Sequence, residues 1–195
     1  MKINECPTVL ITACKPVVVI LFSYLCLNVA AQDIPEPDFS QKPYYYKDGK
    51  LNALENQDGI QKIKPKGMGY GGAEIVYEVP GINSPVRLSS SSLRIIIKNE
   101  GSTDPSESFI LVSGEIKKDT RRFKTGKVAG MVRSNTTDDN RVKIHAKKVR
   151  DNVFEILSDA AIPPGEYALI PYIKEAGIVA AAGNAPLKMY CFGID

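Results

Sequence analysis

The amino-acid sequence predicts an all-β protein, an antiparallel β-sandwich of the immunoglobulin-like or a related type, preceded by an extended N-terminal arm. Eight short apolar or alternating runs recur between residues 73 and 194. Segments rich in Gly, Asn, Asp and Pro separate these runs, as connections between strands require. Beyond residue 31 no stretch keeps a helical period over three turns, and residues 158–163 could form at most a short helical turn.

Residues 1–31 are predicted to be a secretory signal peptide. An uncharged apolar run, residues 16–27, follows Lys15 and is followed by small residues up to Ala31. This is the order of a basic region, an apolar region and a small-residue cleavage site. Cleavage after Ala31 would start the mature chain at Gln32.

An uncleaved anchor is the alternative interpretation of this segment. Counted from Val9, the run is 19 residues long, near the length that spans a bilayer, but Lys15 interrupts it. A lipoprotein-type box ends at Cys14, ahead of the apolar run instead of behind it, so we do not expect lipidation. We expect an exported protein, periplasmic or extracellular in the cell envelope, with no membrane span after cleavage.

Residues 32–65 are predicted to form an extended arm or hairpin laid on the sandwich. Three tyrosines, Tyr44 to Tyr46, precede Asp48 and Gly49, a dipeptide typical of a tight hairpin turn. We see no internal repeat and no second domain, so the remaining residues, 66–195, are assigned to one sandwich domain.

The strands of this domain are expected where apolar residues cluster or alternate with polar ones. The expected strands are residues 73–79, 93–98, 109–116, 127–133, 141–149, 153–157, 166–173 and 187–194. The expected turns include residues 80–85, 99–108, 135–140 and 181–186.

Only one cysteine, Cys191, lies outside the predicted signal peptide, so no internal disulfide is expected in the mature chain. Alternation places Cys191 on the same strand face as Leu187 and Met189. We therefore predict a buried, unreactive thiol.

The segment 162–169 favours the immunoglobulin-like type of sandwich. Ile162, Pro164, Gly165 and Tyr167 fit the pattern hydrophobic-x-Pro-Gly-x-Tyr, in which the tyrosine hydroxyl bonds back to the chain at a corner between two sheets. The tryptophan and the disulfide of antibody domains are absent. The pattern also occurs in unrelated β proteins, so it leaves the topology open.

The run from Gly69 to Leu88 (GYGGAEIVYEVPGINSPVRL), with DPSESFIL, KKDTRRF and PGEYAL after it, resembles a family of exported bacterial proteins of the Bacteroidetes type. The family is uncharacterised. Its Gly-x-x-Ser-Pro-x-Arg motif corresponds here to Gly81, Ser84, Pro85 and Arg87. The resemblance implies a bacterial source, export and a β-rich domain; it implies no activity, ligand or catalytic residue.

Composition argues against nucleic acid as a partner. The whole chain has a net charge of +3. Removing residues 1–31 takes away Lys2, Lys15 and Glu5 and leaves 23 basic and 21 acidic side chains, a net charge of +2. Nucleic-acid-binding domains usually show a strongly basic surface.

No motif predicts catalysis, a cofactor or a metal ion. Residues 67–72 (GMGYGG) match the glycine spacing of dinucleotide-binding loops, but they follow a lysine-rich stretch and open into a strand, with no helix to hold the phosphates. The single histidine, His145, shares a strand face with Lys143 and Lys147, opposite the apolar residues, and is expected to face solvent. Asp138 and Asp139 lack the spaced oxygen ligands of a dedicated calcium site.

Two surface features could bind a partner. A basic segment between the third and fourth expected strands is interpreted as a solvated hairpin tip, with contact to an anionic envelope component such as lipopolysaccharide as the alternative. This segment contains Lys117, Lys118, Arg121, Arg122, Lys124 and Lys127. Six tyrosines could instead form a platform for sugar or peptide. They are Tyr44, Tyr45, Tyr46, Tyr70, Tyr77 and Tyr172.

These observations predict a protein that is not an enzyme and that binds an unknown protein or envelope polymer. A carbohydrate-binding accessory module is the second hypothesis. A hydrolytic enzyme is the third, because no constellation of acid, base and nucleophile is visible in the sequence. No catalytic, ligand-binding or metal-binding residue is assigned.

Overall fold

The computed structural model describes residues 34–65, 72–89, 93–101, 103–129, 132–134, 140–172 and 186–195. These residues belong to one compact unit, Ile34–Asp195. The predicted signal peptide and most of the glycine-rich stretch 67–72 lie outside the described residues. Within the described part, no helix is long and apolar enough to cross a membrane.

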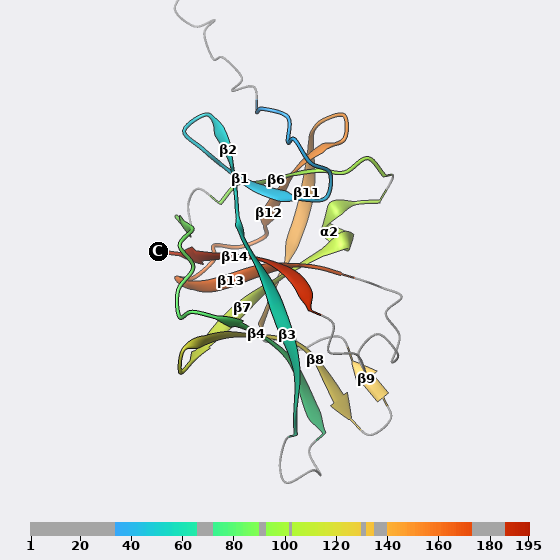
Figure 1. Cartoon of the computed structure of the whole chain (residues 1–195). Coiled ribbons are helices and arrows are strands. Elements are labelled where there is room, and N and C mark those ends of the chain that lie inside the picture. Colours follow the sequence, from blue (N-terminus) through green and yellow to red (C-terminus); the bar gives the residue numbers. More distant parts are fainter. Residues whose placement is uncertain are drawn as a thin grey trace, which may run out of the picture. The chain divides into compact units, whose positions relative to one another are not determined.

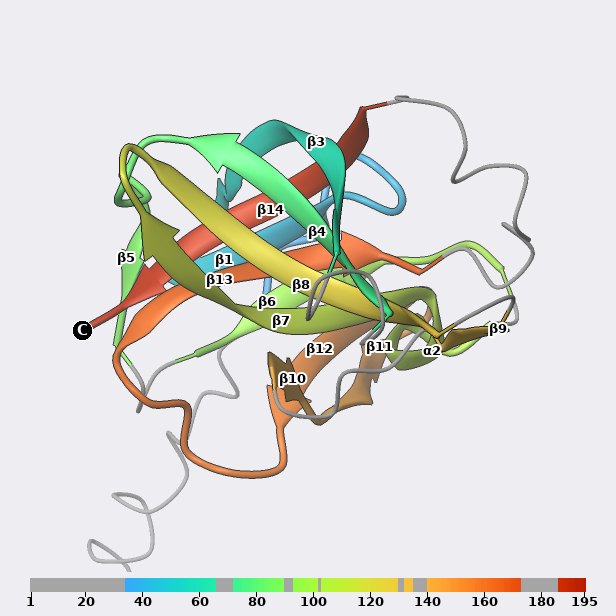
Figure 2. The ribbon, with the colours of Figure 1, turned by 90° about the horizontal axis from the view of Figure 1, so that it is seen from below.

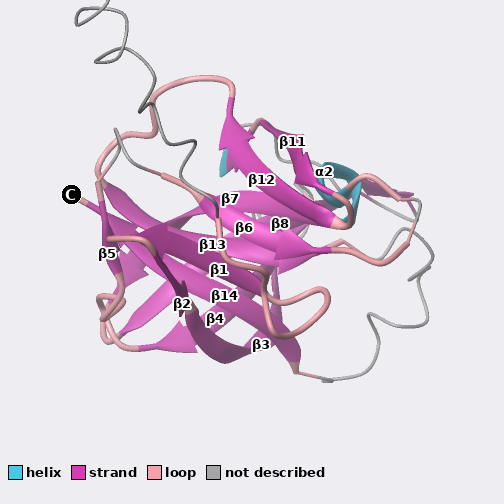
Figure 3. Cartoon of the chain, turned by 90° about the horizontal axis from the view of Figure 1, so that it is seen from above, coloured by secondary structure: helices cyan, strands magenta, loops and turns pink. Residues whose placement is uncertain are grey.

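The prediction of an all-β, antiparallel fold is confirmed (Figure 3). The predicted sandwich does not form. Instead, six strands of the larger sheet close into a barrel (Figures 1 and 2). In order around the barrel these are β7 (Phe109–Lys117), β13 (Gly165–Pro171), β14 (Leu187–Ile194), β3 (Glu55–Pro65), β4 (Ala73–Pro80) and β8 (Thr120–Ala129).

Pairing between β7 and β8 closes the barrel, running from Gly114 opposite Phe123 to Lys117 opposite Thr120. A six-stranded barrel has a narrow interior. Glycines on its strands leave space there for large side chains. A Cβ at Gly114 would lie 2.7 Å from the Phe123 ring, and one at Gly59 would lie 2.2 Å from the Met189 sulfur. The missing side chains therefore allow Phe123 and Met189 to fill the barrel.

Three short strands extend this sheet. β9 (Val132–Ser134) pairs with β8, β10 (Arg141–Val142) pairs with β7, and β5 (Arg87–Leu88) lies parallel to β14. A second sheet of five strands is antiparallel throughout. Its order is β11 (Ile144–Arg150), β12 (Val153–Ser158), β6 (Ile95–Lys98), β1 (Pro43–Lys47) and β2 (Lys50–Ala53).

The segment expected to be a separate arm takes part in both sheets. β1 and β2 form the expected hairpin, and positive φ angles at Asp48 and Gly49 match its two-residue turn. β3, which follows, is a barrel strand between β14 and β4. Residues 32–65 are therefore not an appendage: Leu54, between β2 and β3, lies in the main core.

The one α-helical turn named among the described residues lies elsewhere than expected. α2 (Pro105–Ser108) falls within a predicted connection, and Asp104 caps it by accepting a hydrogen bond from the Ser106 amide. Proline at the first helical position favours this start. Residues 158–163 form no helix.

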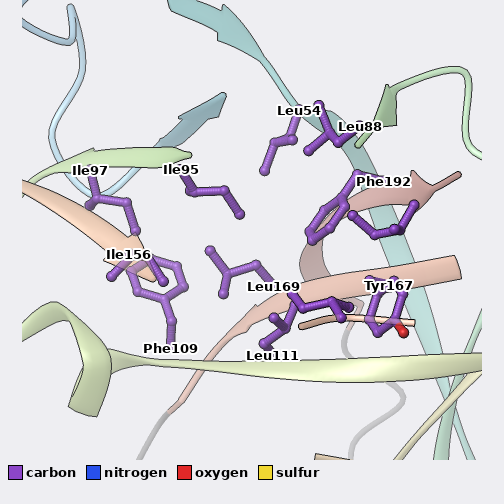
Figure 4. Packing of buried hydrophobic residues seen from close by; sticks show 12 residues of the cluster. Leu54, Leu88, Ile95, Ile97, Phe109, Leu111, Ile156, Tyr167, Leu169 and Phe192 are labelled. Atoms are coloured by element: carbon purple, nitrogen blue, oxygen red, sulfur yellow. The ribbon is translucent and has the colours of Figure 1, made fainter. Parts of the chain in front are cut away.

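The main core lies between the outside of the barrel and the five-stranded sheet. Ile95, Ile97 and Ile156 project from the sheet toward Phe109, Leu111, Leu169 and Phe192 of the barrel (Figure 4). A second cluster, which includes Val112, Phe123, Ala168 and Met189, fills the barrel interior. On the far face of the five-stranded sheet, Ile34 covers Ile96 and Val153.

The predicted tyrosine corner is present although the sandwich is not. The Tyr167 hydroxyl donates to the Pro163 carbonyl oxygen at 2.8 Å, and the ring stacks on Phe192 at 5.9 Å between centroids. Tyr167 is almost completely buried. The motif therefore fixes the entry into β13 at a junction between barrel and sheet.

Candidate functional site

A pocket of about 480 Å³ opens where the barrel and the five-stranded sheet diverge beside α2. We call it the inter-layer pocket. Four segments converge on it: the residues before β1, the end of β6, α2 with the start of β7, and the adjoining ends of β13 and β14. The lining residues are Ser40, Gln41, Ile97, Asn99, Pro105, Ser108, Phe109, Pro171, Tyr172 and Tyr190.

The floor of the pocket is one end of the main core. Ile97 and Phe109 belong to that core and are buried, and Tyr190 packs against it. Pro171 lies opposite Phe109 in the pairing of β13 with β7. An apolar floor with polar groups at the rim is the usual construction of a small-molecule site.

Backbone contacts hold both sides of the rim. The Gln41 amide donates to the Lys98 carbonyl oxygen at 2.7 Å, and a positive φ of 59° turns the chain there. On the barrel side, the Tyr172 amide donates to the Ser108 carbonyl oxygen at 2.7 Å. These bonds connect each rim segment to a strand or to α2, so the rim is fixed before a ligand arrives.

The rim side chains keep unused hydrogen-bonding capacity. Within the described residues, neither the side chains of Ser40 and Gln41 nor the hydroxyls of Tyr172 and Tyr190 have a hydrogen-bond partner. Asn99 is different: its amide donates to the Thr103 carbonyl oxygen at 2.6 Å, which shapes the loop before α2.

Electrostatically the pocket is nearly neutral. Its described lining carries no carboxylate, ammonium, guanidinium, imidazole or thiol. Burial raises the pKa of the Tyr190 hydroxyl, which keeps it protonated as a donor. Outside the lining, the Arg141 guanidinium lies 5.6 Å from the centre of the Tyr172 ring. Such a lining can hold a ligand but offers no acid or base near neutral pH.

The tyrosines do not form the platform considered from the sequence. Alternation along β1 turns Tyr45 toward the main core and Tyr46 to the opposite face of the sheet. Tyr77 lies in the barrel, where its hydroxyl donates to Gln61 at 3.0 Å. Of the five described tyrosines in this set, Tyr172 alone lines the pocket; Tyr70 lies outside the described residues.

The basic segment is not a solvated tip as a whole. Lys117 and Lys118 are exposed at the turn, but Arg121 points into the barrel with only 1% of its surface exposed. Its guanidinium pairs with both oxygens of Glu55, at 2.8 and 2.9 Å, and lies 3.5 Å from Glu166. A charge run predicted to be solvated thus contains the most deeply buried cation among the described residues.

The next two basic residues of this segment are paired on the outer face of the barrel. Arg122 lies 2.7 Å from Glu78, which also contacts Lys62 and Lys64 at 2.5 Å each. Lys124 pairs with Glu115 at 2.6 Å. Carboxylates already neutralise these cations in part. This face therefore attracts a phosphate-bearing partner less strongly than the charge run in the sequence indicates.

The Gly-x-x-Ser-Pro-x-Arg motif closes one end of the barrel. Gly81, at a φ of +82°, presents its carbonyl oxygen to Arg121 at 3.2 Å. The Ser84 amide donates to Glu166 at 2.9 Å, and Arg87 pairs with Glu166 and Asp195. A Cβ at Gly193 would collide with the Arg87 guanidinium. The motif is thus explained by the packing of a buried charge network.

The two residues most often involved in chemistry lie where the sequence predicts them. Cys191 is fully buried in the barrel, and burial raises the pKa of its thiol to about 12. His145 is exposed and contacts Asp159 at 2.7 Å. Asp138 and Asp139 lie outside the described residues, and across the described part no three His, Cys, Asp or Glu side chains gather to hold a metal ion.

Comparison with family models, with curated proteins and with solved structures finds no match to this chain. The assignment of the site therefore depends on its geometry. Sequence reasoning missed most of the pocket lining, including Ser40, Gln41, Asn99 and Tyr190. These residues follow no shared motif, and only the meeting of the two layers brings them together.

Proposed function

We propose that this chain is an exported binding protein of the cell envelope, that its mature part begins at Gln32, and that it binds a protein or polymer of the envelope in the inter-layer pocket without catalysing a reaction. The apolar run and small-residue flank of residues 1–31 support export. A native-host preparation whose intact mass includes residues 1–31 would contradict it.

One observation carries the binding proposal: a pocket with an apolar floor and free hydrogen-bonding groups at a rigid rim. Its volume of about 480 Å³ lies within the range of roughly 300 to 1,000 Å³ that is usual for ligand sites. Because the described lining holds no group that could serve as acid, base or nucleophile at neutral pH, the geometry favours binding over catalysis.

The test uses the chain from Gln32 immobilised and exposed to detergent-solubilised envelope of the producing organism. Ser40→Arg places a bulky charge at the exposed rim, and Asn83→Arg makes the same kind of change on an exposed loop at the closed end of the barrel. We expect Ser40→Arg to remove at least one component that the parent chain and Asn83→Arg both retain. Identical capture by all three proteins would refute a role for the pocket.

A further inference from the structure

We infer that the inter-layer pocket recognises a neutral sugar unit of an envelope polysaccharide or glycan. This inference deepens the proposed function and rests on it. The charges and hydrogen-bonding groups of the pocket lining decide which class of ligand it can bind.

A charged ligand would enter without a counter-ion. The described lining carries no ionised side chain, and Arg141, whose guanidinium lies 5.6 Å from the centre of the Tyr172 ring, is not one of the lining residues. Moving an ionised group from water into a partly buried site is unfavourable unless an opposite charge pairs with it. Acidic sugars, phosphates and ionised peptide termini are therefore disfavoured.

A purely apolar ligand, such as an acyl chain, would also be a poor match. It would cover the unused polar groups of Ser40, Gln41, Tyr172 and Tyr190, which would lose their water partners. Each buried polar group left without a hydrogen bond weakens the binding of such a ligand. Four such groups would cancel much of what the apolar floor contributes.

A sugar ring satisfies both parts of the pocket. Its C–H face can cover the floor at Phe109 and Tyr190, while its hydroxyls meet the rim, which offers hydroxyl donors and acceptors from Ser40 and the tyrosines and an amide from Gln41. The pocket volume of about 480 Å³ lies within the range of roughly 300 to 1,000 Å³ that is usual for small-molecule sites, so one ring can be accommodated.

The experiment screens the chain from Gln32 on an array of neutral manno-, gluco-, galacto- and chito-oligosaccharides with oligogalacturonates and heparin fragments as charged counterparts, followed by calorimetry of the strongest neutral ligand. We expect neutral oligosaccharides to bind and the charged series to bind at least tenfold more weakly. A fluorescent fatty alcohol, which is uncharged, serves as the apolar probe and is expected not to bind.

Two variants connect binding to the rim. Tyr172→Phe with Tyr190→Phe removes two hydroxyls and keeps both rings, and Tyr46→Phe makes the same change outside the pocket lining. Loss of two hydrogen bonds predicts roughly 5- to 150-fold weaker binding for the double variant. Tyr46→Phe is expected to bind like the parent chain.

The outcomes separate this inference from the proposed function. If envelope capture depends on Ser40 but no neutral sugar binds, the ligand class is wrong and the pocket is still a binding site. The same holds if the charged series or the fatty alcohol binds best. If a neutral sugar binds equally to the parent, the double tyrosine variant and Ser40→Arg, the sugar does not occupy this pocket and the inference is overturned.

Discussion

The Arg121 guanidinium meets the Glu55 carboxylate inside the barrel through two parallel contacts of 2.8 and 2.9 Å. The two residues are 66 positions apart, on β8 and β3. Burial by itself raises the pKa of the Glu55 carboxyl. Hydrogen bonds from Arg121, Ser84 and Gln57 outweigh burial and lower that pKa. The pair therefore stays ionised at neutral pH and closes one end of the barrel.

Arg121→Met is expected to destabilise the fold by about 3 to 5 kcal/mol, because it leaves the Glu55 charge buried without its partner. Urea unfolding followed by circular dichroism measures the change. Arg122→Ala is the matched control. This substitution is expected to lower the free energy of unfolding by about 1 kcal/mol or less, since Lys62 and Lys64 still form ion pairs with Glu78.

The double variant Arg121→Met with Glu55→Gln tests the cause of this loss. Removing both charges of a buried pair costs much less than removing one. The double variant should therefore be more stable than Arg121→Met alone. Equal or greater destabilisation would show that packing of the Arg121 side chain, and not its charge, holds the barrel end.

Glu78 should contribute a pH-dependent part of the stability. Burial by itself raises its pKa, but hydrogen bonds from Lys62 and Lys64 lower it from 4.5 to about 2. A carboxyl whose folded pKa is lowered stabilises the fold above its unfolded pKa and loses that contribution as the pH falls through the folded value. The loss should therefore fall between about pH 5 and pH 2.

The measurement compares urea unfolding of the parent chain and Glu78→Gln across that range. The pKa shift limits the stability difference at neutral pH to about 3 kcal/mol. The measured difference should be smaller than this limit, because both lysines remain partly exposed to water. It should shrink toward pH 2. Glu100→Gln removes an exposed carboxylate and is the control. A difference that does not change with pH would contradict the role given to Glu78.

Tyr167→Phe should lower the stability by about 1 kcal/mol, the usual contribution of one hydrogen bond. The substitution removes only the hydroxyl that donates to Pro163 and keeps the ring on Phe192. Thermal or urea unfolding detects a change of this size. No measurable change would mean that the tyrosine corner acts through its ring alone.

The Cys191 thiol should resist labelling in the native chain that starts at Gln32 and take up one maleimide per chain after denaturation. Burial blocks access, and a pKa of about 12 leaves almost no thiolate at pH 8. Mass spectrometry counts the added groups. Rapid labelling of native protein would show that the barrel opens on the timescale of the reaction.

Local patterns in the sequence were sufficient to predict the positions of most strands and the burial or exposure of several side chains. Alternation places Cys191 beside Met189 inside the barrel and His145 outside the core. The Asp48-Gly49 dipeptide predicts its hairpin because both residues must adopt positive φ. The Tyr167 corner is also local, since its hydroxyl reaches a carbonyl four residues earlier.

Other features depend on pairs that are far apart in the chain. A run of charges indicates solvent exposure, yet Arg121 is buried because β3 brings Glu55 to it. From the sequence, β3 is assigned to the arm, since exposed polar residues such as Asn56, Asp58 and Lys62 interrupt any apolar alternation around the buried Gly59. Nothing in the order of Ser40, Asn99, Ser108 and Tyr190 shows that they line one pocket.

By itself, the sequence determined the all-β class, the sites of most strands and which faces of them are buried, because residue alternation and turn chemistry act over a few positions. Tertiary structure alone decided that the sheet closes. A sandwich and a barrel bury the same alternate residues, so the pattern is identical for both. The pairing of Gly114 with Phe123 across β7 and β8 distinguishes them. The inter-layer pocket also depends on tertiary structure, because its lining comes from the barrel, the five-stranded sheet and α2.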